Sequence, residues 1–178
     1  MKKVITLFAA VVMIASFSTS VMAQVGSTAL GAKASSSATA NIVTPIAITK
    51  VADLLFGNVA VDAATGGTVV LEPNGNRTVT LGVTLPATAG THNPASFTVG
   101  GTAGYTYYVT LPIAGTNLQM THGTSDHMTI GTFTSSHAST DNVGTQVLTV
   151  GATLNVGANQ AAGMYTIDAP FYVTVNYN

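Results

Sequence analysis

The sequence predicts an all-β fold, an immunoglobulin-like antiparallel β-sandwich of about nine strands, behind a cleaved N-terminal signal peptide. Three observations predict this fold. Apolar residues alternate with polar ones at every second position in several short segments. Turn sequences rich in glycine, proline and asparagine separate these segments. After residue 23, no stretch of useful length has the apolar period of a helix. Two half-buried sheets must cover each other's apolar faces, which favours a sandwich.

Residues 1–23 have the pattern of an export signal. Lys2 and Lys3 precede a largely apolar run over residues 4–15, and the segment ends in Val21-Met22-Ala23. The apolar run has about twelve residues, whereas a membrane-spanning helix needs about 20. We therefore expect cleavage after Ala23, secretion through the inner membrane, and a location outside the cell or on its surface. A retained anchor helix is the alternative.

The mature part, which begins at Gln24, carries very few charges. Its cations are Lys33, Lys50 and Arg77, against six acidic residues. This argues against nucleic-acid binding, which needs clustered cations. Much of the polar surface must come from the 27 threonines, and neutral hydroxyls repel other copies only weakly, which favours packing into an assembly. The chain has no cysteine, so neither a disulfide nor a catalytic thiol is available.

Residues 41–178 form the predicted sandwich domain. The clearest period-two alternation occurs in residues 77–85, 105–111, 148–156 and 171–177. Weaker strand candidates are residues 41–49, 54–61, 68–72, 95–99 and 128–133. In the segment 105–111, the pattern places Tyr105 and Tyr107 on the inward face and Tyr108 on the outward face, where Tyr172 also points.

Residues 24–40 differ from the rest of the chain because they are small, polar and poor in core-forming side chains. Leu30, Ala32 and Ala34 nevertheless alternate with polar or smaller residues. Two interpretations stay open: a flexible leader, or a donor strand that lies extended along the edge of another sheet.

Several short motifs, in a fixed order over residues 38–178, resemble the DUF4402 family of secreted bacterial domains. They are Leu55-Phe56-Gly57, Gly67-Thr68-Val69, Ala95-Ser96-Phe97-Thr98-Val99-Gly100-Gly101, Tyr107-Tyr108-Val109-Thr110-Leu111-Pro112, Val150-Gly151-Ala152-Thr153-Leu154, Gln160, Gly163-Met164-Tyr165 and Phe171-Tyr172-Val173-Thr174-Val175-Asn176-Tyr177.

This family is similar to pilin-type immunoglobulin-like subunits, including those of the common pilus of enteric bacteria. The resemblance implies a secreted or surface protein. It also implies a C-terminal assembly strand that comprises Phe171, Val173, Val175 and Tyr177, with Tyr177 in the place of the penultimate tyrosine of chaperone-assembled pilins.

These features together predict a structural subunit of a pilus- or fimbria-like surface fibre that is assembled by β-strand donation. The expected partners are other copies of the chain, joined head to tail, together with a periplasmic chaperone and an outer-membrane usher. A sheet that lacks one strand leaves a groove that a neighbour's extended segment fills. The alternative is a surface adhesin or binding module that does not polymerise, with a glycan or host-surface receptor that Tyr108 and Tyr172 contact.

No constellation of residues predicts catalysis. His122, Asp126 and His127 lie within six residues, with His137 and Asp141 downstream, and these side-chain types suit a divalent metal. Their surroundings are rich in threonine, serine and glycine, so we expect solvated loop residues instead. Neither a Gly-x-Ser-x-Gly motif nor a glycine-rich nucleotide loop is present. The prediction is therefore no catalytic residue, no metal site and no cofactor.

Overall fold

The computed structural model describes residues 32–178 except 114, 138 and 143. The chain divides into two units, Met1–Asn41 and Ile42–Asn178, of which the second is the folded domain. The described part of the first unit, residues 32–41, is exposed and has no secondary structure. The predicted signal peptide and Leu30 lie outside the described residues. In the part of the chain that is described, no helix is long and apolar enough to cross a membrane.

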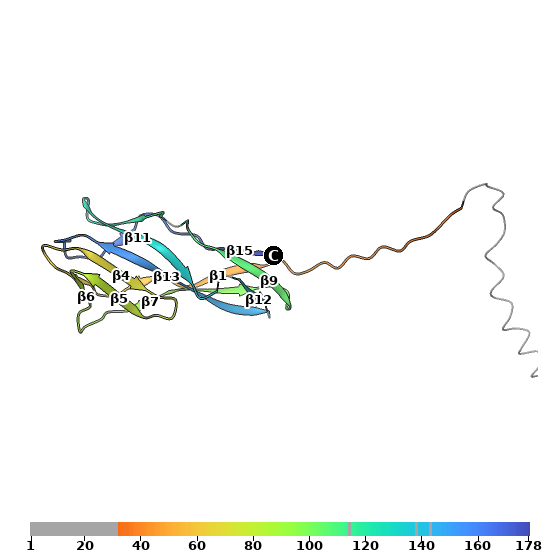
Figure 1. The fold of residues 1–178 in the computed structure, drawn as a ribbon, viewed down its shortest axis with the longest axis horizontal. Helices are drawn as coiled ribbons and strands as arrows, with labels where there is room; N and C mark the ends of the chain where they lie inside the picture. The colour runs from red at the N-terminus through yellow and green to blue at the C-terminus, as the bar shows by residue number, and fades with distance from the viewer. Residues whose placement is uncertain (1–31, 114, 138, 143) are drawn as a thin grey trace, which may run out of the picture. The chain divides into compact units, whose positions relative to one another are not determined.

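The described residues form β-strands and loops, with no helix, which confirms the all-β prediction. The strands are β1 (Ala47–Ala52), β2 (Leu55–Phe56), β3 (Ala60–Val61), β4 (Gly67–Leu71), β5 (Arg77–Leu81), β6 (Val83–Thr84), β7 (His92–Asn93), β8 (Ala95–Gly100), β9 (Tyr105–Thr110), β10 (Leu118–His122), β11 (Asp126–Ser135), β12 (Ser139–Asn142), β13 (Thr145–Val156), β14 (Thr166–Ile167) and β15 (Thr174–Tyr177) (Figure 1).

The strands pair antiparallel in one large sheet and three small ones. The large sheet has the order β1-β8-β13-β11-β10-β14, and β4 joins it by pairing with β13 and β5. A second sheet has the order β12-β9-β15, and two strand pairs, β2-β7 and β3-β6, complete the domain. In the domain, β15 and the C-terminus lie at one end, and β5 and β6 lie towards the opposite end (Figure 1).

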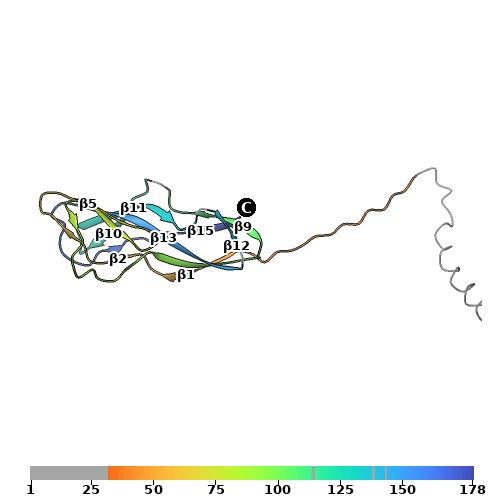
Figure 2. The same cartoon turned by 60° about the horizontal axis from the view of Figure 1, so that its bottom comes forward.

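The long strand β13 runs through the middle of the domain (Figure 2). Its first half pairs with β8, its second half pairs with β4, and β11 also pairs with it. Every second side chain from Leu148 to Val156 is buried, as the alternation predicts. This strand contributes to both parts of the core.

The core consists of two clusters of buried side chains. The buried members of the first are Phe56, Val69, Leu71, Val83, Ile130, Ala152, Leu154 and Val156. The buried members of the second are Ala95, Val99, Tyr107, Leu148, Val150 and Val175. The second cluster packs the large sheet against the sheet of β9 and β15, which is the sandwich arrangement that the sequence predicts.

Several element boundaries differ from the prediction. Residues 77–85 form two strands, β5 and β6, because Leu81 adopts a left-handed conformation with φ 55° and the chain turns at Gly82. The Thr65 carbonyl oxygen approaches Gly82 so closely that a larger residue would collide with it. In the C-terminal segment, the paired strand covers only Thr174–Tyr177. The sequence did not predict β10 and β12. The described part of the chain has fifteen strand segments instead of the expected nine, since several are only two residues long.

The prediction for Tyr105 is wrong in part. Tyr107 is fully buried, as expected, but Tyr105 is 40% exposed. Tyr105 lies near the end of the sandwich, where its ring packs against that of Tyr177 with centroids 5.7 Å apart. The alternation correctly places Tyr105 on the same face of β9 as Tyr107. At this end of the strand, however, the core does not cover the Tyr105 side chain.

Candidate functional site

The first and last strands of the domain leave two neighbouring edges open. In the described chain, β1 is the terminal strand of the large sheet and β15 is the terminal strand of its own sheet, so neither has a strand partner on its outer edge. The two strands approach each other, and Ile48 from β1 and Val175 from β15 belong to the same core cluster. Unpartnered edges of this kind are where an additional strand is able to pair.

A narrow cavity of about 230 Å³ opens between β1 and the segment that precedes β15. Lys50, Ala52 and Leu54 line it from the β1 side. Ile167, Pro170 and Phe171 line it from the C-terminal side, and Phe97 and Ile130 also contribute. The lining is mostly apolar, so the cavity suits small aliphatic side chains better than charged groups.

A wider cavity of about 800 Å³ adjoins the narrow one. It lies between residues 54–61 and residues 160–165, and its lining also includes Met120, Met128, Leu154 and Val156. Leu54 lines both cavities, so they adjoin. We call the combined depression, between residues 50–61 and residues 160–171, the edge groove.

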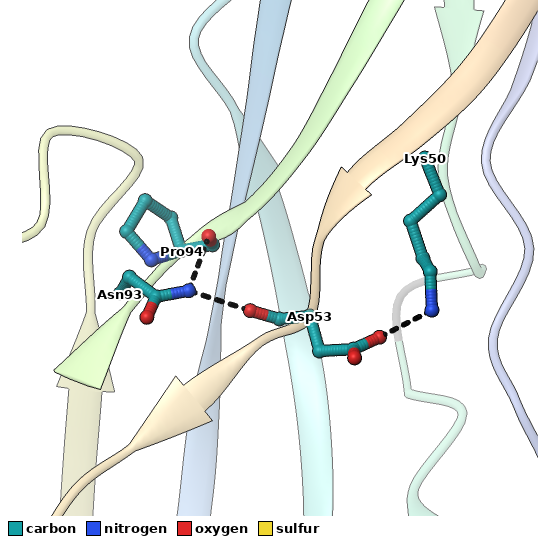
Figure 3. A network of polar contacts seen from close by, with 4 residues as sticks. All are labelled: Lys50, Asp53, Asn93 and Pro94. Carbon is teal, nitrogen blue, oxygen red and sulfur yellow. Dashed lines mark hydrogen bonds and ion pairs between the residues drawn. The ribbon is translucent and has the colours of Figure 1, made fainter. Parts of the chain in front are cut away.

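The N-terminal rim of the edge groove is held in place by polar contacts (Figure 3). The side-chain amide of Asn93 donates hydrogen bonds to the carbonyl oxygen of Asp53 at 2.7 Å and to that of Pro94 at 3.3 Å. The Lys50 ammonium lies 2.7 Å from the Asp53 carboxylate. That ion pair is exposed and adds little stability. The hydrogen bonds from the Asn93 side-chain amide, in contrast, attach the connection between β1 and β2 to the connection between β7 and β8.

The opposite rim, residues 157–165, is braced from two sides. The Gln160 side-chain amide donates to the Tyr165 hydroxyl at 2.9 Å, and that hydroxyl donates to the Ala161 carbonyl at 2.9 Å. The ring of His122 lies against Tyr165 and 3.2 Å from the Met164 carbonyl oxygen through Nδ1. Both rims are therefore held by contacts within the domain, and the edge groove is preformed.

Of the C-terminal residues singled out in the sequence, Phe171 lines the narrow cavity, and the others belong to the core next to it. Phe171, Val173, Val175 and Tyr177 all pack into the second core cluster. The Tyr177 hydroxyl donates to the Thr44 carbonyl at 2.8 Å and accepts from the Thr102 backbone N–H at 2.7 Å. The penultimate tyrosine thus ties the last strand to the segment that enters β1. No local sequence signal identifies Thr44 or Thr102 as its partners.

The histidine-containing segment is an ordered hairpin rather than the expected loop. His122 and Asp126 are paired at the end of β10 and β11. His127 Nδ1 lies 3.1 Å from the Thr121 hydroxyl, which donates to the Asp168 carboxylate at 2.9 Å. Within the described residues, no three histidine, cysteine or acidic side chains are grouped so that they hold a metal ion.

The remaining predicted site residues are exposed. Ala32 and Ala34 belong to the leader and form no strand, and Leu30 lies outside the described residues. Tyr108 is 43% exposed and Tyr172 is 76% exposed. Both tyrosines lie on the outer side of the segments to which they belong, which confirms the outward orientation that the alternation predicts.

The sequence model of the family described as "Domain of unknown function (DUF4402)" matches residues 46–177. The match covers most of the chain and the whole sandwich from just before β1 to the end of β15, so the chain belongs to the DUF4402 family. Comparisons with curated proteins and with solved structures find no similar protein.

Proposed function

We propose that this member of the DUF4402 family is a structural subunit of a bacterial surface fibre, secreted through the inner membrane. In the proposed fibre, the leader of one copy, residues 24–40, lies as an additional strand in the edge groove of the next copy. The observation that carries this proposal is the preformed apolar edge groove between residues 50–61 and residues 160–171, which begins beside the open edge of β1. A periplasmic chaperone and an outer-membrane usher would cover the groove before assembly.

The length and pattern of the leader suit the groove. Residues 24–40, fully extended, span about 56 Å at about 3.3 Å per residue. The N-terminal edge of the groove, residues 50–61, spans about 40 Å on the same scale, so the leader is long enough to cross it. An extended leader places Leu30, Ala32 and Ala34 on one face, towards the groove, and Lys33 on the other, towards water.

The direction of the donated strand follows from where the chain enters the domain. Residues 42–46 lead into β1 at the end where Tyr177 holds Thr44. If the leader runs antiparallel to β15, the donor's Ile42 emerges at the opposite end of the acceptor, and copies join head to tail without closing. A leader that runs parallel to β15 would instead bring the C-terminal ends of the two domains together, and the two copies would form a closed dimer. A fibre therefore requires the antiparallel direction.

The direct test removes the leader. The chain without residues 24–37, exported behind the same signal peptide, should fold as a monomer and form no filaments, whereas the intact chain polymerises. Circular dichroism checks folding, and negative-stain microscopy of shed surface material checks filaments. Filaments from the truncated chain, or none from the intact chain under any condition, would contradict strand donation.

A second candidate function is a non-polymerising adhesin, and the exposure of Tyr108 and Tyr172 favours it. Exposed aromatic rings on a sheet suit contact with sugar rings or a host protein surface. In that case, Tyr108→Ala or Tyr172→Ala should abolish saturable binding on a glycan array or to host cells, and binding should not depend on the leader. Binding that both variants retain would remove this candidate.

A further inference from the structure

We propose that successive subunits also touch end to end, with Leu81 and Met164 of one copy against Ile42 of the next. This inference rests on the proposed fibre and adds a second contact to the donated strand. It concerns the end of the domain opposite the C-terminus, where the wide cavity opens. The partner is a second copy of this chain.

Leu81 is the first observation. It adopts a left-handed backbone conformation with φ 55°, and its side chain is 83% exposed. This conformation is unfavourable for residues with a Cβ atom, and asparagine or glycine tolerates it better than leucine. A leucine there is strained and gains no burial in the isolated domain. Strain of this kind points to a role outside the domain, such as contact with a partner.

Met164 is the second observation, and it belongs to the same end of the domain. The carbonyl oxygen of Gly82, next to Leu81, accepts a hydrogen bond from the Asp62 N–H at 2.8 Å. The Asp62 carbonyl in turn accepts one from the Asn159 N–H at 3.1 Å, in the rim loop that carries Met164. Met164 is 74% exposed. Two large apolar side chains are thus presented to water, one at the end of β5 and one on the rim loop, and Asp62 ties these two segments together.

The donated strand determines what meets this surface. In the head-to-tail direction, the leader leaves the edge groove beside residues 60–62, and the next residues of the donor follow at once. Ile42 is the first residue of the donor's domain unit and is 95% exposed. The donated strand therefore delivers an exposed isoleucine to the end that presents Leu81 and Met164. Burial of the three side chains would remove apolar surface from water on both copies.

Cysteine cross-linking tests the contact cleanly because the chain has no cysteine of its own. The Ile42→Cys/Leu81→Cys variant, assembled and mildly oxidised, should give a ladder of disulfide-linked oligomers on a non-reducing gel. Disulfides form only when the two Cα atoms come within about 7 Å. The matched control is Ile42→Cys/Ile113→Cys, since Ile113 is also exposed, at 81%, but lies in the loop that follows β9. This control should give no ladder.

A second variant tests the same contact without cross-linking. Leu81→Asn should leave the monomer folded, because the Leu81 side chain is exposed and asparagine relieves the left-handed strain. Its fibres should still form through the groove but bend more, with a shorter persistence length in negative-stain images.

The outcomes separate the two proposals. Fibres that give no Ile42→Cys/Leu81→Cys ladder, or Leu81→Asn fibres that bend no more than wild-type fibres, would overturn the end-to-end contact and leave strand donation intact. A wild-type chain that never forms fibres would overturn both.

Discussion

The central strand β13 and the edge strand β1 differ in how far their apolar side chains are buried. Leu148 and Val150 on β13 are fully buried, whereas Ile48 on β1, which packs against the same core cluster, is only partly buried. The strand β13 has partners on both edges and β1 has a partner on one. An apolar residue in a strand therefore becomes buried only where neighbouring strands and the opposite sheet cover it. This difference in burial identifies the open edge of β1 as the place where the sandwich has room for another strand.

The largest effect should come from filling the groove. Ala52 lines the narrow cavity, which has room for a larger side chain, so Ala52→Phe should leave the monomer folded and block the donated strand completely. Ala47→Phe is the matched control, because Ala47 is also on β1 but is exposed and does not line the cavity. Filament counts by negative-stain microscopy should fall to background for the first variant only. Normal filaments from Ala52→Phe would show that the groove is not the acceptor.

The next effect compares the two strands directly through stability. Leu148→Ala removes a fully buried side chain from the second core cluster and should lower the free energy of unfolding by about 2–5 kcal/mol. Val51→Ala changes an exposed side chain and should alter it by less than about 0.5 kcal/mol. Urea denaturation of the leader-deleted monomer, followed by circular dichroism, measures both. Equal losses would mean that the Val51 side chain is as well covered as the Leu148 side chain.

Alternation along the sequence predicted the face of each major strand, but not every interruption. β13 and β8 follow their predicted segments because each residue alternates with its neighbours and both strands have partners on both sides. The Thr65 carbonyl group approaches the break at Gly82, and no pattern local to residues 77–85 reveals that approach. β10 escaped prediction because Leu118 and Met120 alternate over too few residues.

The edge groove was harder to predict than the strands. The sequence identified Tyr177 and the apolar residues of the C-terminal segment, but Tyr177 meets Thr44 and Thr102, which lie 133 and 75 positions away. The wide cavity combines residues 54–61 with residues 160–165. Contacts between such distant segments are set by topology, and a single sequence carries no periodicity that reports them.

Loosening the attachment of the last strand should have a moderate effect. Tyr177→Phe keeps the ring in the core but removes the hydroxyl that bonds Thr44 and Thr102, and it should destabilise the leader-deleted monomer by about 1–2 kcal/mol. Tyr172→Phe is the control, because Tyr172 is 76% exposed, and should change stability by less than about 0.5 kcal/mol. Thermal or urea unfolding measures both variants. A neutral Tyr177→Phe would mean that the last strand is held by its apolar residues alone.

The smallest effect at neutral pH should come from Tyr107, whose hydroxyl donates to the Gln146 side-chain oxygen at 3.0 Å. Tyr107→Phe should cost about 1 kcal/mol through the lost hydrogen bond. Burial raises the pKa of Tyr107 because the ionised phenolate is disfavoured in the core. Since the folded-state pKa lies above the unfolded value of about 10, the stability from the neutral tyrosine is complete below about pH 10 and is lost as the pH rises through the folded-state pKa.

Urea denaturation at about pH 8 and about pH 11 should therefore show a smaller alkaline loss of stability for Tyr107→Phe than for the wild-type monomer. The difference arises because β9 lies between β12 and β15 and buries Tyr107. Equal alkaline losses in the two proteins would mean that water reaches the Tyr107 hydroxyl in the folded domain.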